Sequence, residues 1–182
     1  ASLMIIPDIV NNWLYKHKRQ IFKLWYIIVF ADWKLIAFYS PYLLFIDCDA
    51  EIDNTCFINN YLAECQGTTI VCGGIKYDNV CPNKDFLLRW KYGIKRECKN
   101  TDFSSFNFLI SKELFNKIKF NELFPVYGFE DTFFRFSLHK QGIKLKKINN
   151  PLIHKGLYDS EEFILRTEEC LRALSDLYKM QK

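Results

Sequence analysis

Short apolar runs of strand length recur along the chain, separated by segments with helical spacing. Apolar runs of roughly four to eight residues, bounded by Pro, Gly or Asp, are typical of buried strands. They predict strands at 2–7, 24–30, 42–46, 68–72 and 106–110, and the alternation of apolar residues with lysine predicts an exposed edge strand at 143–148. Helical spacing and capping residues predict helices at 8–20, 53–66, 86–95, 111–117, 130–141 and 160–180.

The order of these elements predicts the fold class. Strands and helices alternate over most of the chain, which indicates an α/β fold with a mixed, mainly parallel sheet flanked by helices. The last helix is amphipathic, so we expect one of its faces to point inward. That face consists of Phe163, Cys170, Leu171, Leu174, Leu177 and Tyr178.

The composition fits a single domain over all 182 residues, because 49% of them are apolar and 17% aromatic. The net charge of +4 is too small to indicate a nucleic-acid partner, but it suits a phosphate-bearing ligand or peripheral association with a membrane. Seven cysteines without a CxxC pair indicate reduced thiols. No signal peptide is evident and no apolar run is long enough to span a bilayer, so we expect a cytoplasmic protein, with the inner face of the membrane as a second location.

Asp47 and Asp49 follow the apolar run at 42–46 directly. Two carboxylates at the carboxyl end of a buried strand lie where open α/β folds bind ligands. A divalent cation would relieve their repulsion and bridge them to a diphosphate, and oxygen ligands favour Mg²⁺ or Mn²⁺ over zinc. The alternative is a capped turn before the helix predicted at 53–66.

A second acidic pair, Glu130 and Asp131, opens the helix predicted at 130–141. A carboxylate at a junction between a loop and a helix can act as a general base toward an attacking hydroxyl. The same position also suits ordinary acidic residues that complement the helix dipole.

Three further residues stand out beside strands. His154 follows Pro151 and could complete an oxygen-rich metal site, although a lone histidine is more often structural. Gly73 and Gly74 follow the strand predicted at 68–72 and indicate a tight turn where the backbone approaches a ligand or another strand. Neither a P-loop nor a GxGxxG dinucleotide motif is present.

Taken together, these motifs resemble those of family 2 glycosyltransferases of the GT-A fold, particularly their galactosyl- and N-acetylhexosaminyl-transferring branches. The matching stretches, in order, are SLMIIP at the start, YIIVFAD at 26–32, YLLFIDCDAEI at 42–52, CGG at 72–74, FSSFNFLISKELF at 103–115, GFEDTFFRFSLHKQG at 128–142 and NPLIHKG at 150–156. The resemblance implies a GT-A (Rossmann-like) sheet, with an abbreviated nucleotide-binding part at 1–40, a metal, donor and acceptor part at 41–156 and a C-terminal helix at 157–182.

The resemblance also implies roles for individual residues. Asp32 would contact the nucleotide base, Asp47 the ribose or the metal, and Asp49 the metal. Asn107 and the loop at 103–107 would lie near the donor sugar or the acceptor, and Gly73 and Gly74 would contribute to the donor site. Asp131 would be the catalytic base, Glu130 would bind the acceptor or sugar, and His154 would join the metal.

The resemblance therefore predicts a metal-dependent, inverting glycosyltransferase of polysaccharide biosynthesis. It would use Mn²⁺ or Mg²⁺ to move a hexose or N-acetylhexosamine from a UDP-sugar to a glycan, glycolipid or other hydroxyl acceptor. Two alternatives remain: a sugar-phosphate nucleotidyltransferase, and a catalytically silent module that binds sugar nucleotides.

Overall fold

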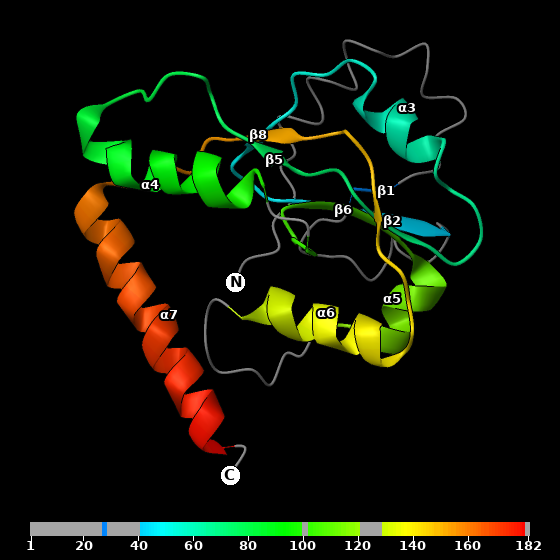
Figure 1. The fold of residues 1–182 in the computed structure, drawn as a ribbon. Coiled ribbons are helices and arrows are strands. Elements are labelled where there is room, and N and C mark those ends of the chain that lie inside the picture. Colours follow the sequence, from blue (N-terminus) through cyan, green and yellow to red (C-terminus); the bar gives the residue numbers. More distant parts are fainter. Residues whose placement is uncertain (1–26, 29–40, 100–101, 121–128, 181–182) are drawn as a thin grey trace.

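A computed structural model describes residues 27–28, 41–99, 102–120 and 129–180 (Figure 1). The strand predicted at 2–7, the helix predicted at 8–20 and Asp32 lie outside these residues. Of the strand predicted at 24–30, only Ile27–Ile28 (β1) is described, and it is extended. Among the described residues, no helix is both long enough and apolar enough to cross a membrane.

The main sheet has five strands in the order β1-β2-β6-β4-β7. The bounds are Tyr42–Ile46 (β2), Asn107–Ser111 (β6), Ile70–Cys72 (β4) and Lys146–Lys147 (β7). β1 runs parallel to β2 and β7 parallel to β4, but β6 is antiparallel to both of its neighbours. The expectation of a mainly parallel sheet is therefore wrong, and the sheet is mixed. The chain enters β6 beside the carboxyl end of β2, where Asn107 pairs with Ile46, so β6 must run back along β2.

A second, three-stranded sheet was not predicted. Its order is Ala50–Glu51 (β3), Leu152–His154 (β8) and Ile75–Lys76 (β5), with β8 in the middle, antiparallel to β3 and parallel to β5. The two outer strands have two residues each, too short for a periodic pattern to reveal them. This sheet sets His154 opposite Ala50, one residue after Asp49.

Helices cover both faces of the main sheet (Figure 1). Phe57–Leu62 (α3) lies on one face, and Lys112–Ile118 (α5) and Glu130–Lys140 (α6) lie on the other. Side chains of β2 alternate between two cores: Leu43 and Phe45 pack toward α5 and α6, whereas Tyr42 and Leu44 pack toward α3. The expectation of a helix-flanked α/β fold is confirmed.

The helical segment at 84–97 lies beside the three-stranded sheet, and the C-terminal helix packs against it. Leu87–Tyr92 (α4) follows a 3-10 turn at Lys84–Phe86 (η2) and continues into a π-helical turn at Gly93–Glu97 (η3). Ser160–Met180 (α7) packs against α4 and then extends away from the body of the molecule (Figure 1). Leu171 and Leu174 of α7 are 59% and 46% exposed, so the inward face predicted there is wrong for both.

Several boundaries follow local chemistry as predicted. β2 begins and ends where the apolar run does. The Ser111 hydroxyl accepts from the Leu114 N–H and caps α5, and α6 ends just before Gly142, whose φ is +69°. α3 is shorter than the helix predicted at 53–66, because Asn54 accepts from the Cys56 N–H and forms a turn ahead of it.

Candidate functional site

Four of the predicted site residues line one open cleft of about 840 Å³. Asp47 and Asp49 reach it from the turn after β2, Asp131 from the first turn of α6, and His154 from the end of β8. The loop at 102–106 also lines the cleft, and the Asp47 N–H donates to the Phe106 carbonyl at 3.0 Å. Residues far apart in the sequence thus meet at the carboxyl end of β2.

Asp49 and His154, two of the three predicted metal ligands, lie side by side. Asp49 Oδ2 lies 3.9 Å from His154 Nε2, and the Lys155 N–H donates to the Asp49 carbonyl at 2.8 Å. Gly156 makes this approach possible, since a Cβ there would lie 1.8 Å from Asp49 Oδ2. Among the described residues, no three His, Cys, Asp or Glu side chains gather closely enough to hold a metal ion by themselves.

The His154 ring is held between two aromatic rings. Tyr77 stacks on it at 5.3 Å between centroids and 13° between planes, and Phe106 at 4.9 Å and 8°. Burial lowers the pKa of His154, against the opposing pull of Asp49, so the imidazole is neutral at pH 7. The neutral form of imidazole, which has a lone pair on one ring nitrogen, is the form that binds metals.

Arg89 of α4 lies directly beside His154, although it is not among the predicted site residues. Its Nη2 is 3.4 Å from His154 Nε2, and its Nη1 is 3.1 Å from Glu97 Oε1. Tyr77 connects the same groups, because its hydroxyl donates to Glu97 and its ring stacks on His154. Burial, and after it the charge of Glu97, raises the pKa of Tyr77, so its hydroxyl stays protonated.

The charges around the cleft are predominantly negative. The lining residues include five carboxylates (Asp47, Asp49, Glu97, Asp102 and Asp131) and three guanidinium groups (Arg89, Arg135 and Arg166). With His154 neutral, the described lining residues carry two negative charges in excess, and such a surface favours a cation. Arg135 stands four residues after Asp131 on α6, a spacing that places both on one helix face and could have identified it from the sequence.

Asp131 is oriented by the loop at 102–106. Its Oδ2 accepts the Ser105 N–H at 3.0 Å, while Arg135 of the next turn pairs with Asp102. These two contacts hold the start of α6 against the loop. Glu130 is the first residue of α6, but its side chain lies outside the described set.

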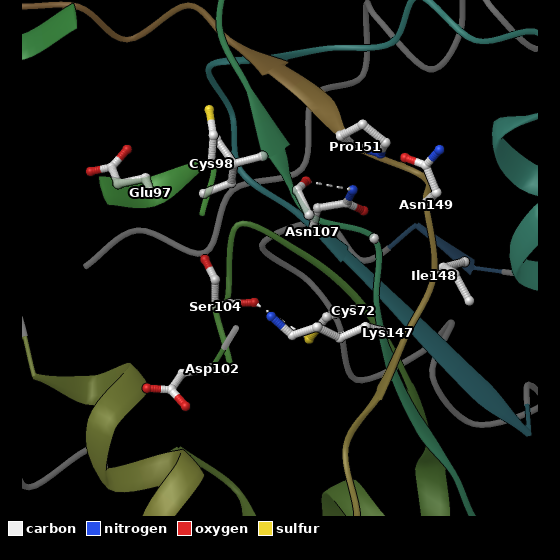
Figure 2. A pocket seen from close by; sticks show the side chains of 13 residues that line it. Cys72, Glu97, Cys98, Asp102, Ser104, Asn107, Lys147, Ile148, Asn149 and Pro151 are labelled. Carbon is white, nitrogen blue, oxygen red and sulfur yellow. Dashed lines mark hydrogen bonds between the residues drawn. The ribbon is translucent and has the colours of Figure 1, made fainter. Parts of the chain in front are cut away.

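The other three predicted residues line a neighbouring pocket of about 210 Å³ (Figure 2). Gly73 and Gly74 form the turn after β4, and Asn107 opens β6. The Asn107 amide donates to the carbonyls of Gly74 and Asn150, at 3.3 and 2.9 Å, and its oxygen accepts from the Tyr61 hydroxyl at 2.6 Å. Its side chain is therefore occupied by contacts within the fold.

Gly73 has no room for a side chain. A Cβ there would lie 2.4 Å from the Tyr61 hydroxyl and 2.5 Å from the Asn107 amide nitrogen. Gly74 has a φ of +96°, which favours glycine. The pair thus serves a close approach between β4 and the segment before β8, where the Asn150 and Leu152 N–H groups donate to the Gly73 and Gly74 carbonyls.

Comparison with known proteins adds no assignment: no family model matches the chain, and no match is found among the curated proteins.

Proposed function

We propose that this chain is a metal-dependent glycosyltransferase of the GT-A type. It would move a hexose or N-acetylhexosamine from a UDP-sugar to a hydroxyl group of a glycan or glycolipid. The observation that carries the proposal is the meeting of Asp47, Asp49, Asp131 and His154 on one cleft. Its volume of about 840 Å³ also suits a ligand of nucleotide-sugar size.

The residues present fit a divalent cation. Asp49 and His154 would hold it, with Asp47 on the same cleft, and two protein ligands suffice where substrate phosphates supply others. The neutral imidazole favours Mn²⁺ over Mg²⁺, because Mg²⁺ prefers oxygen ligands alone. When bound, the cation would neutralise the negative charge of the departing diphosphate.

Asp131 would act as the base. The Ser105 N–H fixes one of its oxygens, so the carboxylate faces the cleft in a defined orientation. It would accept the proton of the acceptor hydroxyl while that oxygen forms a bond to the anomeric carbon of the donor sugar. The bond between this carbon and the diphosphate oxygen breaks on the opposite face, its electron pair leaves with UDP, and the configuration inverts.

A donor screen tests the proposal. The chain is incubated with UDP-, GDP- and TDP-sugars and Mn²⁺, and nucleotide release is followed with and without hydroxyl acceptors. We expect release from a UDP-hexose or UDP-N-acetylhexosamine that depends on the metal. Asp131→Asn should slow transfer by about 10³-fold and leave UDP affinity unchanged, because a base is not needed to bind the donor.

Two outcomes would replace the proposal. Metal-dependent UDP binding with no transfer to any acceptor would indicate a silent binding module. Release of pyrophosphate from a nucleoside triphosphate in the presence of a sugar phosphate would indicate a nucleotidyltransferase. Full transfer activity in Asp131→Asn would remove Asp131 from the role of base.

A further inference from the structure

Arg89 is a buried cation on the wall of the cleft. Its residue surface is only 4% exposed, and its guanidinium carbon lies 5.4–5.9 Å from the ring centroids of Tyr77, Tyr158 and Phe163. Glu97 is its counterion, at 3.1 Å. The other two arginines on the cleft, Arg135 and Arg166, belong instead to half-exposed ion pairs with Asp102 and Glu162.

The hydrogen-bonding capacity of Arg89 is only partly used. Its Nε is buried and has no hydrogen-bond partner among the described residues, and its Nη1 contacts Glu97 without the alignment of a hydrogen bond. A buried guanidinium usually engages its donors with a carboxylate or a phosphate. The spare donors therefore indicate that Arg89 has a further, anionic ligand.

Arg89 also faces the lone pair of His154. Its Nη2 donates toward His154 Nε2 at 3.4 Å, so Nε2 is the acceptor and Nδ1 carries the ring proton. His154 Nδ1 is buried and has no hydrogen-bond partner among the described residues. The ring nitrogen that offers a lone pair is thus the one that Arg89 covers.

A cation held by Asp49 and His154 needs this same lone pair. We propose that Arg89 and the divalent cation exclude each other at His154 Nε2, and that the displaced guanidinium then binds the diphosphate. Without metal, Arg89 supplies the positive charge beside Asp49 and His154. With metal, its spare donors turn to the phosphate oxygens, so metal and diphosphate binding become coupled through one side chain. The inference rests on the proposed function, because it assumes that metal and diphosphate share this cleft.

The test measures binding of Mn²⁺ and of pyrophosphate, separately and together, by titration calorimetry. Arg89→Met should bind Mn²⁺ at least about tenfold more tightly than the unchanged chain, because the competing charge is gone. In saturating Mn²⁺, the same variant should bind pyrophosphate about tenfold more weakly. Arg172→Met is the matched control: it removes one exposed arginine of α7 and should change neither affinity.

Equal or weaker Mn²⁺ binding by Arg89→Met would overturn the inference, and so would unchanged pyrophosphate binding. If this variant does not fold, ¹⁵N NMR of His154 in the unchanged chain decides. The metal-free ring should carry its proton on Nδ1, and a proton on Nε2 would contradict the inference. If the unchanged chain transfers sugar but Arg89→Met alters neither the Mn²⁺ nor the pyrophosphate affinity, this inference is refuted and the proposed function stands. If Arg89→Met changes both affinities as expected but the unchanged chain transfers no sugar, only the proposed glycosyl transfer is refuted.

Discussion

Two buried polar networks lie close to each other in this protein, and they differ in how completely their hydrogen bonds are satisfied. The asparagine network consists of Tyr61, Asn107 and Asn150. The Asn150 oxygen accepts from Asn60 at 2.9 Å and its nitrogen donates to the Phe57 carbonyl at 2.9 Å, while Asn107 is bonded through both of its amide atoms. This network ties α3, β6 and the segment before β8 together.

The cleft network consists of Tyr77, Arg89, Glu97 and His154. Here His154 Nδ1 and Arg89 Nε remain without hydrogen-bond partners among the described residues, although both atoms are buried. An unsatisfied buried donor costs roughly 1–3 kcal/mol, so a fold tolerates it mainly where a ligand or a function requires it. The asparagine network therefore has the complete hydrogen bonding of a structural element, and the unsatisfied atoms of the cleft network mark it as a candidate binding site.

The largest expected effect comes from breaking the asparagine network. Asn107→Leu keeps a similar volume but removes every hydrogen bond that the side chain makes to Tyr61, Gly74 and Asn150. We expect a loss of about 3 kcal/mol in the free energy of unfolding, measured by urea denaturation. Asn59→Leu, at an exposed position of α3, should change it by less than about 0.5 kcal/mol. A similar loss in both variants would contradict the structural role given to Asn107.

A smaller effect, on binding alone, is expected from Gly156→Ala. The new Cβ would overlap Asp49 Oδ2, so the carboxylate must turn away from His154. Affinity for Mn²⁺, measured by calorimetry, should fall about tenfold, with little change in unfolding free energy. Gly67→Ala should show the reverse pattern, because Gly67 has a φ of +61° and nothing within 4 Å of its added Cβ. If the Mn²⁺ affinity of Gly156→Ala is unchanged, Asp49 is not a ligand of the metal.

The smallest expected effect comes from Tyr77→Phe. This change removes the hydroxyl that donates to Glu97 but keeps the ring that stacks on His154. We expect a loss of about 1 kcal/mol in unfolding free energy and a change in Mn²⁺ affinity of less than about threefold. Tyr42→Phe removes a hydroxyl bonded to the Gly67 carbonyl and should cost a similar amount without touching the cleft. A tenfold loss of metal affinity in Tyr77→Phe alone would show that the hydroxyl, and not the ring, positions His154.

Local features of the fold could be predicted from the sequence because they depend on neighbouring residues. The apolar run at 42–46 predicted β2, Ser111 predicted the cap of α5, and Gly142 predicted the end of α6. The direction of β6 could not be predicted. It depends on where the loop before it returns the chain to the sheet, and the sequence of that loop has no clear hydrophobic periodicity. The exposure of Leu171 and Leu174 on α7 could not be predicted either, because amphipathic spacing shows that a helix has an apolar face but not whether another surface covers that face.

In the candidate site, too, residues in local motifs could be predicted, and a residue brought in by the fold could not. Asp47, Asp49, Asp131 and His154 were chosen from local motifs, and the structure places them on one cleft. Arg89 could not be chosen, because it lies 65 residues before His154 in a helix without any recognised motif. Its importance comes from burial and from the ring nitrogen that it faces, and both are properties of the folded chain.

The two-residue strand β7 has a consequence for how copies of this protein meet one another. It forms the edge of the five-stranded sheet next to β4, and Lys146 and Lys147 are both exposed on it. Lys146 is paired with Glu64, which holds the short strand in place. If the same edge of a second molecule paired with β7, few backbone N–H and C=O groups would be available for hydrogen bonds, and lysines of the two copies would face each other. The short, lysine-bearing strand β7 therefore disfavours pairing between the sheets of two copies on this side.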